Sequence, residues 1–140
     1  MQLTMFRAKL HQLRVTEADL HYEGSITIDE ELLEAAGILP YEKVQVVNVN
    51  NGERLETYTI PGEPGERTVK LNGPAARLAA VGDEVIAIAY ARMTPEEAQT
   101  HRPRVVLMDA HNDPTEITDL DVKDDTPDLP DDMPEEALTA

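Results

Sequence analysis

Short segments with strand periodicity, separated by turn signals, fill most of the first 110 residues and limit the possible folds more than any other feature. Residues 44–49 alternate between two faces, and Asn51-Gly52 predicts a tight hairpin with a type I′ turn before a returning strand at 54–60. Other predicted extended segments are 1–16, 25–28, 68–71, 81–93 and 105–108. This pattern, with only two or three short helices, predicts a mainly β chain that closes into a small barrel.

Local signals place the short helices between these strands. Asp29 can cap a helix that runs to Ala36, and Gly37 is well placed to end it. The run Thr94-Pro95-Glu96-Glu97 has the pattern of a capping box with proline at the first helical position. A third, small-residue helix is predicted around residues 75–80, after a turn at 72–74.

Charge divides the chain into a domain and a tail. The net charge is −16, and residues 109–140 hold 12 acidic residues and one basic residue. That composition predicts a folded domain at 1–110 and a disordered acidic tail at 111–140. The tail is interpreted as a solubilising appendage, with docking to a protein as the alternative. Nucleic acid is not expected as a partner, because phosphate binding needs clustered Lys and Arg.

Several kinds of site and location are not expected. The chain has no cysteine, which excludes disulfides and thiolate chemistry, and its four histidines lack the spacing of metal ligands. No apolar run is long enough to span a bilayer, and the first residues lack the apolar block of a signal peptide. We therefore expect a cytoplasmic protein with no metal and no membrane partner.

The pair Gly24-Ser25 is the remaining candidate for chemistry. Taken alone, Gly-Ser is an ordinary turn sequence. A serine hydroxyl nevertheless lies close to the preceding carbonyl and can attack it where the backbone is strained, and glycine permits the unusual dihedral angles and leaves that carbonyl unshielded. Such an attack would exchange the amide for an ester. Elimination and hydrolysis would then leave a ketone at the new N-terminus, which is a pyruvoyl group.

The sequence closely resembles the aspartate 1-decarboxylase family of pyruvoyl enzymes over about residues 1–110. The longest match runs from Thr16 to Ser25 and is nearly unbroken from Ala18 onwards. The other matching elements occur in the family's order and spacing: Lys9-Leu10-His11, Asp29, residues 35–39, Asn51-Gly52, Arg54, Thr57-Tyr58, Asn72-Gly73 and Val81-Gly82-Asp83. The resemblance implies a double-psi β-barrel, assembled as a homotetramer with sites between neighbouring subunits.

The resemblance also implies a role for each matching residue. The chain cuts itself between Gly24 and Ser25, Ser25 becomes the pyruvoyl group that takes the substrate amine, and Tyr58 donates the proton that replaces the lost carboxylate. Thr57 contacts the substrate and assists the cleavage. The remaining implied positions are the substrate loop Gly73, Pro74 and Ala75, the carboxylate anchors Arg54 and Lys9, and the supporting residues Tyr22 and Asn72.

This resemblance predicts decarboxylation of L-aspartate to β-alanine and CO2, which feeds pantothenate and coenzyme A synthesis without a metal or pyridoxal phosphate. Considered singly, Arg54 and Lys9 are typical surface charges of strands, and Tyr58 is typical of a packed aromatic. Two alternatives therefore stay open. One is a non-enzymatic β-barrel interaction module with an acidic tail, and the other is the same chemistry on another amino acid.

Overall fold

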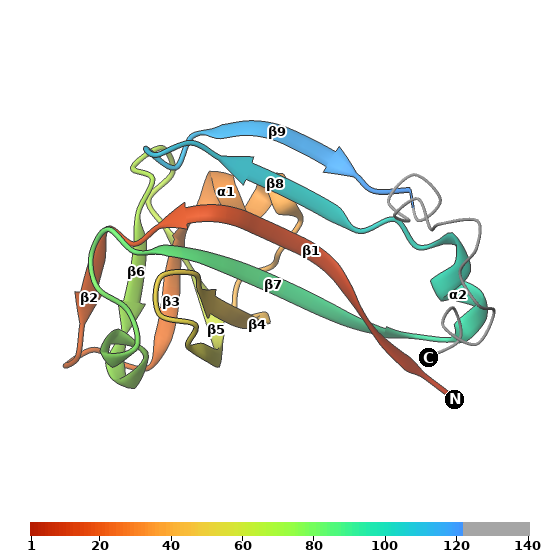
Figure 1. The fold of residues 1–140 in the computed structure, drawn as a ribbon, viewed down its shortest axis with the longest axis horizontal. Helices are drawn as coiled ribbons and strands as arrows, with labels where there is room; N and C mark the ends of the chain where they lie inside the picture. The colour runs from red at the N-terminus through yellow and green to blue at the C-terminus, as the bar shows by residue number, and fades with distance from the viewer. Residues whose placement is uncertain (122–140) are drawn as a thin grey trace, which may run out of the picture.

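The computed structural model describes residues 1–121, and strands make up most of its regular structure (Figure 1). The elements in chain order are β1 (Leu3–Arg14), β2 (Glu17–Asp19), β3 (Ser25–Asp29), α1 (Glu30–Ala36), β4 (Lys43–Asn48), β5 (Arg54–Gly62), β6 (Val69–Asn72), the 3₁₀ helix η1 (Gly73–Arg77), β7 (Glu84–Met93), α2 (Pro95–Thr100), β8 (Arg104–Met108) and β9 (Pro114–Asp119). The predicted mainly β fold with a few short helices is confirmed.

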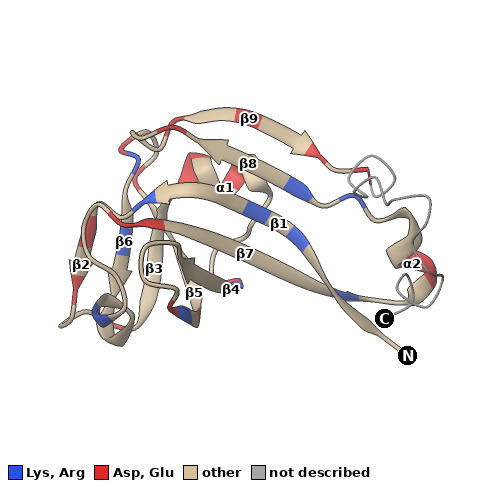
Figure 2. Ribbon diagram, in the orientation of Figure 1, with Lys and Arg blue, Asp and Glu red and all other residues tan. Residues whose placement is uncertain are grey.

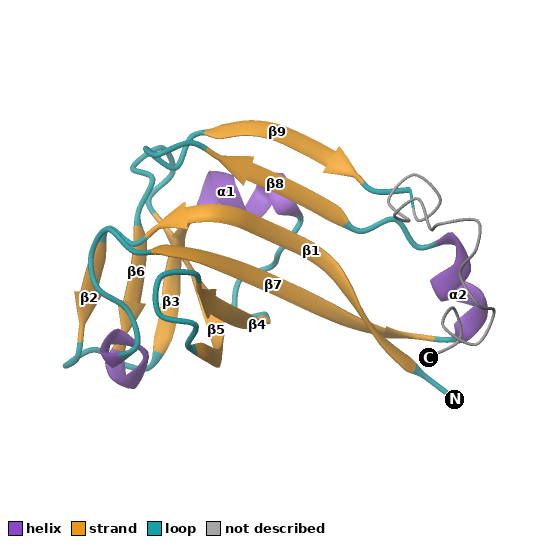
Figure 3. Cartoon of the chain, viewed as in Figure 1, coloured by secondary structure: helices purple, strands orange, loops and turns teal. Residues whose placement is uncertain are grey.

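Within the described residues the strands form one sheet, in the order β2-β6-β3-β5-β4-β7-β1-β8-β9 (Figure 3). Three neighbouring pairs are parallel, namely β1 with β8, β2 with β6, and β3 with β5. The partners of each parallel pair lie far apart along the chain, so the connections between them cross. This interleaving is in keeping with the double-psi β-barrel expected from the resemblance.

The sheet curls around one hydrophobic core. β1 and β6 are far apart in the strand order, yet the residue after Val15 bonds to β6: the backbone N–H of Thr16 donates to the Val69 carbonyl at 2.8 Å, and the Val69 N–H donates to the Thr16 hydroxyl at 2.9 Å. Fully buried apolar side chains from β1, β3, β4, β6, β7, β8 and α1 meet inside this curve. The predicted barrel is therefore closed through hydrogen bonds of Thr16 as well as through strand pairing.

The local helix signals act as predicted. Asp29 is the N-cap of α1 and accepts the backbone N–H of Glu31, and Gly37 ends the helix in the left-handed conformation with φ of 73°. The capping box at Thr94 and Glu97 begins α2. The small-residue segment is a 3₁₀ helix that starts at Gly73, two residues before the predicted start.

The turn between β4 and β5 differs from the prediction. A type I′ turn needs positive φ at both central residues, but only Gly52 has it, at 76°. The loop is longer, because the Asn48 and Asn51 side chains accept the backbone N–H groups of Asn50 and Glu53 at 2.9 Å each. These Asx turns satisfy the loop backbone locally, so the tight two-residue turn is not formed.

The boundary between the domain and its tail also needs correction. We expected the last strand at 105–108 and a disordered tail from residue 111, but β9 pairs antiparallel with β8. Arg104 of β8 holds Asp119 of β9 through an ion pair at 2.7 Å, and buried Asn112 lies in the turn between the two strands. The rest of the predicted tail, 122–140, lies outside the described residues.

Charges are unevenly placed on the sheet. Figure 2 shows basic positions along β1, which carries Arg7, Lys9 and Arg14, and acidic positions on both α-helices and on β9, which β8 separates from β1. No helix within residues 1–121 combines the length and the apolar character needed to cross a membrane.

Candidate active site

Ser25 lies at the start of β3 with no solvent exposure. Antiparallel pairing of β3 with β6 sets it opposite Asn72, the last residue of β6. The Asn72 side-chain Nδ2 donates to the Ser25 Oγ at 2.8 Å, and that Oγ is itself 3.4 Å from the Glu23 carbonyl oxygen. The hydroxyl beside the predicted cleavage point is therefore shielded from water and held by a buried amide.

Gly73 follows Asn72 and packs directly against the chain before Ser25. Its φ is 64°, and a Cβ at this position would lie 2.8 Å from the Tyr22 carbonyl oxygen and 2.9 Å from the Gly24 nitrogen and Cα. Glycine is thus required here for its backbone conformation and for space. The Pro74 ring lies on the other predicted glycine, with its Cδ 3.7 Å from the place of a Gly24 Cβ.

Pairing of β3 with β5 brings the predicted cleavage point towards Thr57 and Tyr58. The parallel register sets Ile26 opposite Thr59. Continuing this register by one and two positions sets Ser25 opposite Tyr58 and Gly24 opposite Thr57. Pairing of the two strands begins at Ile26 and Thr59, so the part of β5 before Thr59 borders an open space instead of β3.

That space is a cavity of about 410 Å³ between the start of β5, Gly24 and η1. Its lining is Gly24, Leu55, Glu56, Thr57, Tyr58, Pro74, Ala75 and Leu78. Five of these positions were predicted from the sequence, and they come from three separate segments of the chain. The cavity is large enough for a small amino acid, and the polar residues of its lining are Glu56, Thr57 and Tyr58.

Comparison with known proteins decides the family. A profile described as "Aspartate decarboxylase" matches residues 1–115. The chain belongs to this family. The curated protein named aspartate 1-decarboxylase from Salinibacter ruber is 76% identical over 126 residues, which cover 90% of this chain and 86% of that protein. A protein of the same name from Desulfitobacterium hafniense strain DCB-2 is 65% identical over 81% of this chain and 90% of that protein. Another, from Carboxydothermus hydrogenoformans, is 57% identical over 90% of this chain and 99% of that protein.

Among solved structures, the computationally designed protein msDPBB_sym2 is similar in part. Its TM-score is 0.37 at 18% identity, and the likeness covers 65% of this chain and 100% of the designed chain.

In this member of the aspartate decarboxylase family, the two predicted carboxylate anchors do not line the cavity. Lys9 and Arg54 belong to the outer face of the sheet, because Ala8 and Leu10 on either side of Lys9 are fully buried and Arg54 is exposed at the start of β5. Strand β1 is the third strand from β5 in the sheet order, so the two strands lie about 14 Å apart at the usual spacing of neighbouring strands. Lys9 instead lies over the Phe6 ring, with Nζ 4.8 Å from the ring centroid.

Tyr22, the other predicted supporting residue, is half exposed beside the cleavage segment. The Lys70 ammonium group lies over the Tyr22 ring, with Nζ 4.7 Å from the ring centroid. Lys70 also lies within 4 Å of Glu17 and Asp19 on β2. This cation therefore ties β2 and Tyr22 to β6, the strand that carries Asn72.

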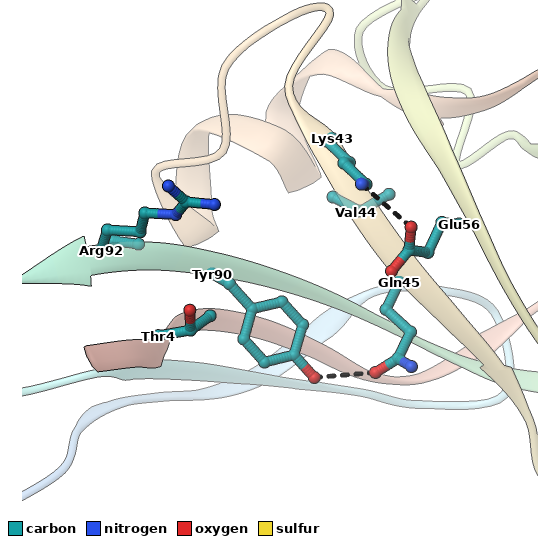
Figure 4. Close-up of a pocket in the computed structure, with 8 residues that line it drawn as sticks. Thr4, Lys43, Val44, Gln45, Glu56, Tyr90 and Arg92 are labelled. Atoms are coloured by element: carbon teal, nitrogen blue, oxygen red, sulfur yellow. Dashed lines mark hydrogen bonds and ion pairs between the residues drawn. The ribbon is translucent and has the colours of Figure 1, made fainter. Parts of the chain in front are cut away.

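A second hollow of about 280 Å³ opens on the outer face beside the cavity (Figure 4). Lys43 and Glu56 form an ion pair across its edge at 2.9 Å, and the Tyr90 hydroxyl donates to the Gln45 side chain at 2.7 Å. Glu56 lines both hollows. Because Lys43 partly offsets the charge of Glu56, this side of the cavity repels an anion less than the carboxylate alone would.

Sequence reasoning missed the apolar wall of the cavity. Leu55 lies two residues before Thr57 on the same strand, so both side chains lie on one face. The two-residue period of a strand could therefore have identified Leu55 as a lining residue. Leu78 gave no comparable signal. Its carbonyl accepts the Asn48 side chain at 3.0 Å, and Asn48 also donates to Asp83 at 2.9 Å. The Ala80 N–H and the Asn48 amide lower the pKa of Asp83, so this carboxylate stays charged and fixes the segment that closes the cavity.

Proposed function

We propose that this chain cuts itself between Gly24 and Ser25 and then decarboxylates L-aspartate to β-alanine and CO2, on a pyruvoyl group made from Ser25. One observation carries the proposal. The Ser25 hydroxyl is buried, accepts a hydrogen bond from Asn72 and directly follows a glycine that borders a cavity with Thr57 and Tyr58. Membership of the aspartate decarboxylase family supports the same reaction, and the β-alanine would feed pantothenate and coenzyme A synthesis in the cytoplasm.

Self-cleavage is a sequence of bond exchanges at one residue. The Ser25 Oγ bonds to the Gly24 carbonyl carbon, the C–N bond breaks, and the hydroxyl proton passes to the Ser25 nitrogen. Loss of the Ser25 α-proton then expels the Gly24 carboxylate and leaves a dehydroalanine. Water converts that residue to a ketone and releases ammonia. The N–H of Asn72 stabilises negative charge on the Oγ during the first step.

The surroundings of Ser25 fit a pyruvoyl group. The side-chain oxygen of Asn72 is buried without a hydrogen-bond partner among the described residues, so it can accept a donor that processing or the substrate brings. Asn72, Gly73 and Ala75 would hold the group beside the cavity. When present, it would supply an electron sink for the electron pair that stays on the substrate carbon as CO2 leaves. Tyr58 lines the cavity and would return a proton to the substrate carbon, and the apolar Leu55 and Leu78 of the same lining would limit the access of water.

The two predicted carboxylate anchors, Arg54 and Lys9, lie outside this cavity. We propose that Arg54 and Lys9 bind the substrate carboxylates as the chains assemble into a homotetramer, in which the outer face of one copy meets the cavity of a neighbour. The distance between β1 and β5 supports a contribution of Lys9 from a second copy, since Lys9 is too far from the cavity of its own chain. A guanidinium can hold a carboxylate through two hydrogen bonds, and an ammonium adds a point charge.

Intact-mass measurement tests the proposal most directly. Purified wild-type protein should give fragments of 24 and 116 residues under denaturing conditions, with a blocked N-terminus on the larger fragment. Ser25→Ala should remain one chain and produce no β-alanine. A wild-type chain that stays whole after prolonged warm incubation would contradict self-processing and favour a binding module.

Tyr58→Phe separates cleavage from decarboxylation. The variant should cleave like wild type but lose about 10²- to 10⁴-fold in kcat, because only the proton donor is removed. Tyr90→Phe is the matched control, since its hydroxyl bonds to Gln45 outside the cavity. Product analysis with L-aspartate and L-glutamate distinguishes the proposed substrate from another amino acid.

A further inference from the structure

The amide of Asn72 contacts a second hydroxyl besides that of Ser25. Its Nδ2 also donates to the Thr27 Oγ1 at 3.0 Å, beside the 2.8 Å bond to the Ser25 Oγ. Ser25 and Thr27 are two residues apart on β3, so their side chains lie on the same face of the strand. Asn72 reaches both of them from the paired strand β6.

These two bonds use the full donor capacity of the amide. A side-chain amide has two N–H groups, and each has one hydroxyl acceptor here. The other end, Oδ1, is buried without a partner among the described residues. In this orientation Asn72 presents a donor, not an acceptor, to Ser25. The terminal torsion of asparagine is soft and two-fold, so the orientation depends on which contacts hold the amide.

We propose that Thr27 is a positioning residue for the self-cleavage of this chain: its hydroxyl holds the Asn72 amide with Nδ2 towards Ser25. The inference rests on the proposed function, because it concerns the same cleavage step. Without the Thr27 hydroxyl one N–H of the buried amide has no acceptor, and the amide loses the contact that holds it in place. When the amide rotates by half a turn, Oδ1 takes the place of Nδ2 beside the Ser25 hydroxyl. The amide then no longer stabilises negative charge on that oxygen.

The methyl group of Thr27 has a separate, structural role. Its Cγ2 would lie 3.2 Å from a Cβ at Gly62, so it packs closely over the backbone of the neighbouring strand β5. Thr27→Val keeps a β-branched side chain with this methyl group and replaces the hydroxyl with a second methyl group of similar size. Thr27→Ser keeps the hydroxyl and removes the methyl. The two variants therefore separate orientation of Asn72 from packing.

The experiment follows conversion of freshly purified full-length precursor into two fragments by intact mass, at one temperature and pH. Thr27→Val should cleave about tenfold more slowly than wild type, and Thr27→Ser should cleave within about twofold of the wild-type rate. Thr27→Ala, which lacks both groups, should be as slow as Thr27→Val. Each substitution is also made in a Ser25→Ala chain, which cannot cleave, and its unfolding midpoint in urea is compared with that of Ser25→Ala alone.

Slow cleavage by Thr27→Val, restored in Thr27→Ser and without a matching change in the unfolding midpoint, supports the inference. Cleavage of Thr27→Val at the wild-type rate overturns the inference alone and leaves the proposed function standing. Slow cleavage in all variants, in proportion to their loss of stability, assigns Thr27 a structural role only and also overturns it. A wild-type chain that never cleaves overturns the proposed function and this inference together.

Discussion

At the scale of single residues, the candidate site depends on close backbone contact as well as on polar groups. Gly73 packs so closely against the segment before Ser25 that any side chain at this position would collide with Tyr22 and Gly24. The same residue adopts a positive φ, which costs other residues about 1 kcal/mol or more. Both properties place the backbone before Ser25 in one defined position. This is the condition that an intramolecular attack requires.

Gly73→Ala tests this contact. A Cβ 2.8 Å from the Tyr22 carbonyl must displace the segment, so cleavage should slow at least about tenfold. Gly52→Ala is the matched control, because Gly52 also has positive φ, at 76°, but nothing lies within 4 Å of its Cβ position. It should lose about 1 kcal/mol of stability and cleave normally. The assay is intact mass over time, and equal cleavage rates in the two variants would contradict the proposed contact.

At the scale of elements, Asp29 joins β3 to α1 and to the loop before β6. Its side chain is fully buried and accepts backbone N–H groups from Glu31 at 2.8 Å and Arg67 at 2.6 Å. Burial alone would raise the pKa of Asp29, but these N–H groups, a third from Gly65 and the Arg67 guanidinium together lower it below its usual value. The far end of the strand that begins at Ser25 is therefore anchored by a buried charge.

Acid should weaken this anchor. A lowered folded-state pKa means that the stabilisation by Asp29 is present above its ordinary value of about 3.9 and is lost as pH falls through the folded value. Asp29→Asn should be about 1–3 kcal/mol less stable at pH 7, and the difference should shrink towards pH 3. Urea unfolding in a Ser25→Ala background measures it. Asp113→Asn, an exposed partner of the same Arg67, should change stability by less than about 1 kcal/mol, and an Asp29 difference independent of pH would contradict the assignment.

Elements with strong local signals were predictable from the sequence, and elements that depend on distant partners were not. Asp29 and Gly37 specify both ends of α1 within nine residues. Strand β9 has a mostly exposed surface and many polar residues, so only its pairing with β8 reveals it. The predicted pairing of the two strands around Asn51-Gly52 is present, since β4 and β5 are antiparallel neighbours. The predicted tight turn is absent, because Asx turns at Asn48 and Asn51 lengthen the loop.

The residues of the candidate site divide in the same way, into those with a recognisable local motif and those whose contacts depend on distant strands. Gly24, Ser25, Thr57 and Tyr58 were found because their motifs match a family in order. The contact between Ser25 and Asn72 joins residues 47 positions apart, and it exists because β3 pairs with β6. No local pattern encodes that distance. Thr27 was missed for the same reason, since a threonine in a strand is unremarkable until the amide beside it is seen.

At the scale of the whole molecule, the proposed cleavage point and the cavity lie together in a single chain, but Lys9 of that chain lies far from both. The described body also carries more acidic than basic residues, so a dicarboxylate substrate needs local cations at the site. Strand β1 carries Lys9 together with Arg7 and Arg14, and Figure 2 shows these basic positions along the strand. An assembly that sets this strand against the cavity of another copy would supply the missing charge. A closed symmetric assembly would repeat the arrangement at every site.

Subunit complementation tests that arrangement. Ser25→Ala and Lys9→Ala chains should each be nearly inactive alone, the first without a cleavage product and the second with normal cleavage but weakened substrate binding. Co-expressed in equal amounts, they should recover about a quarter of wild-type activity, because half of the sites keep Ser25 and half of those receive Lys9 from a neighbour. Sedimentation should give four times the chain mass of 15.5 kDa for the mixture and for wild type. Mixed assemblies that form but stay inactive would show that Lys9 acts within its own chain, and a Lys9→Ala chain that is fully active alone would show that Lys9 does not act in the reaction. Either result would make the proposed contribution from a neighbouring copy wrong.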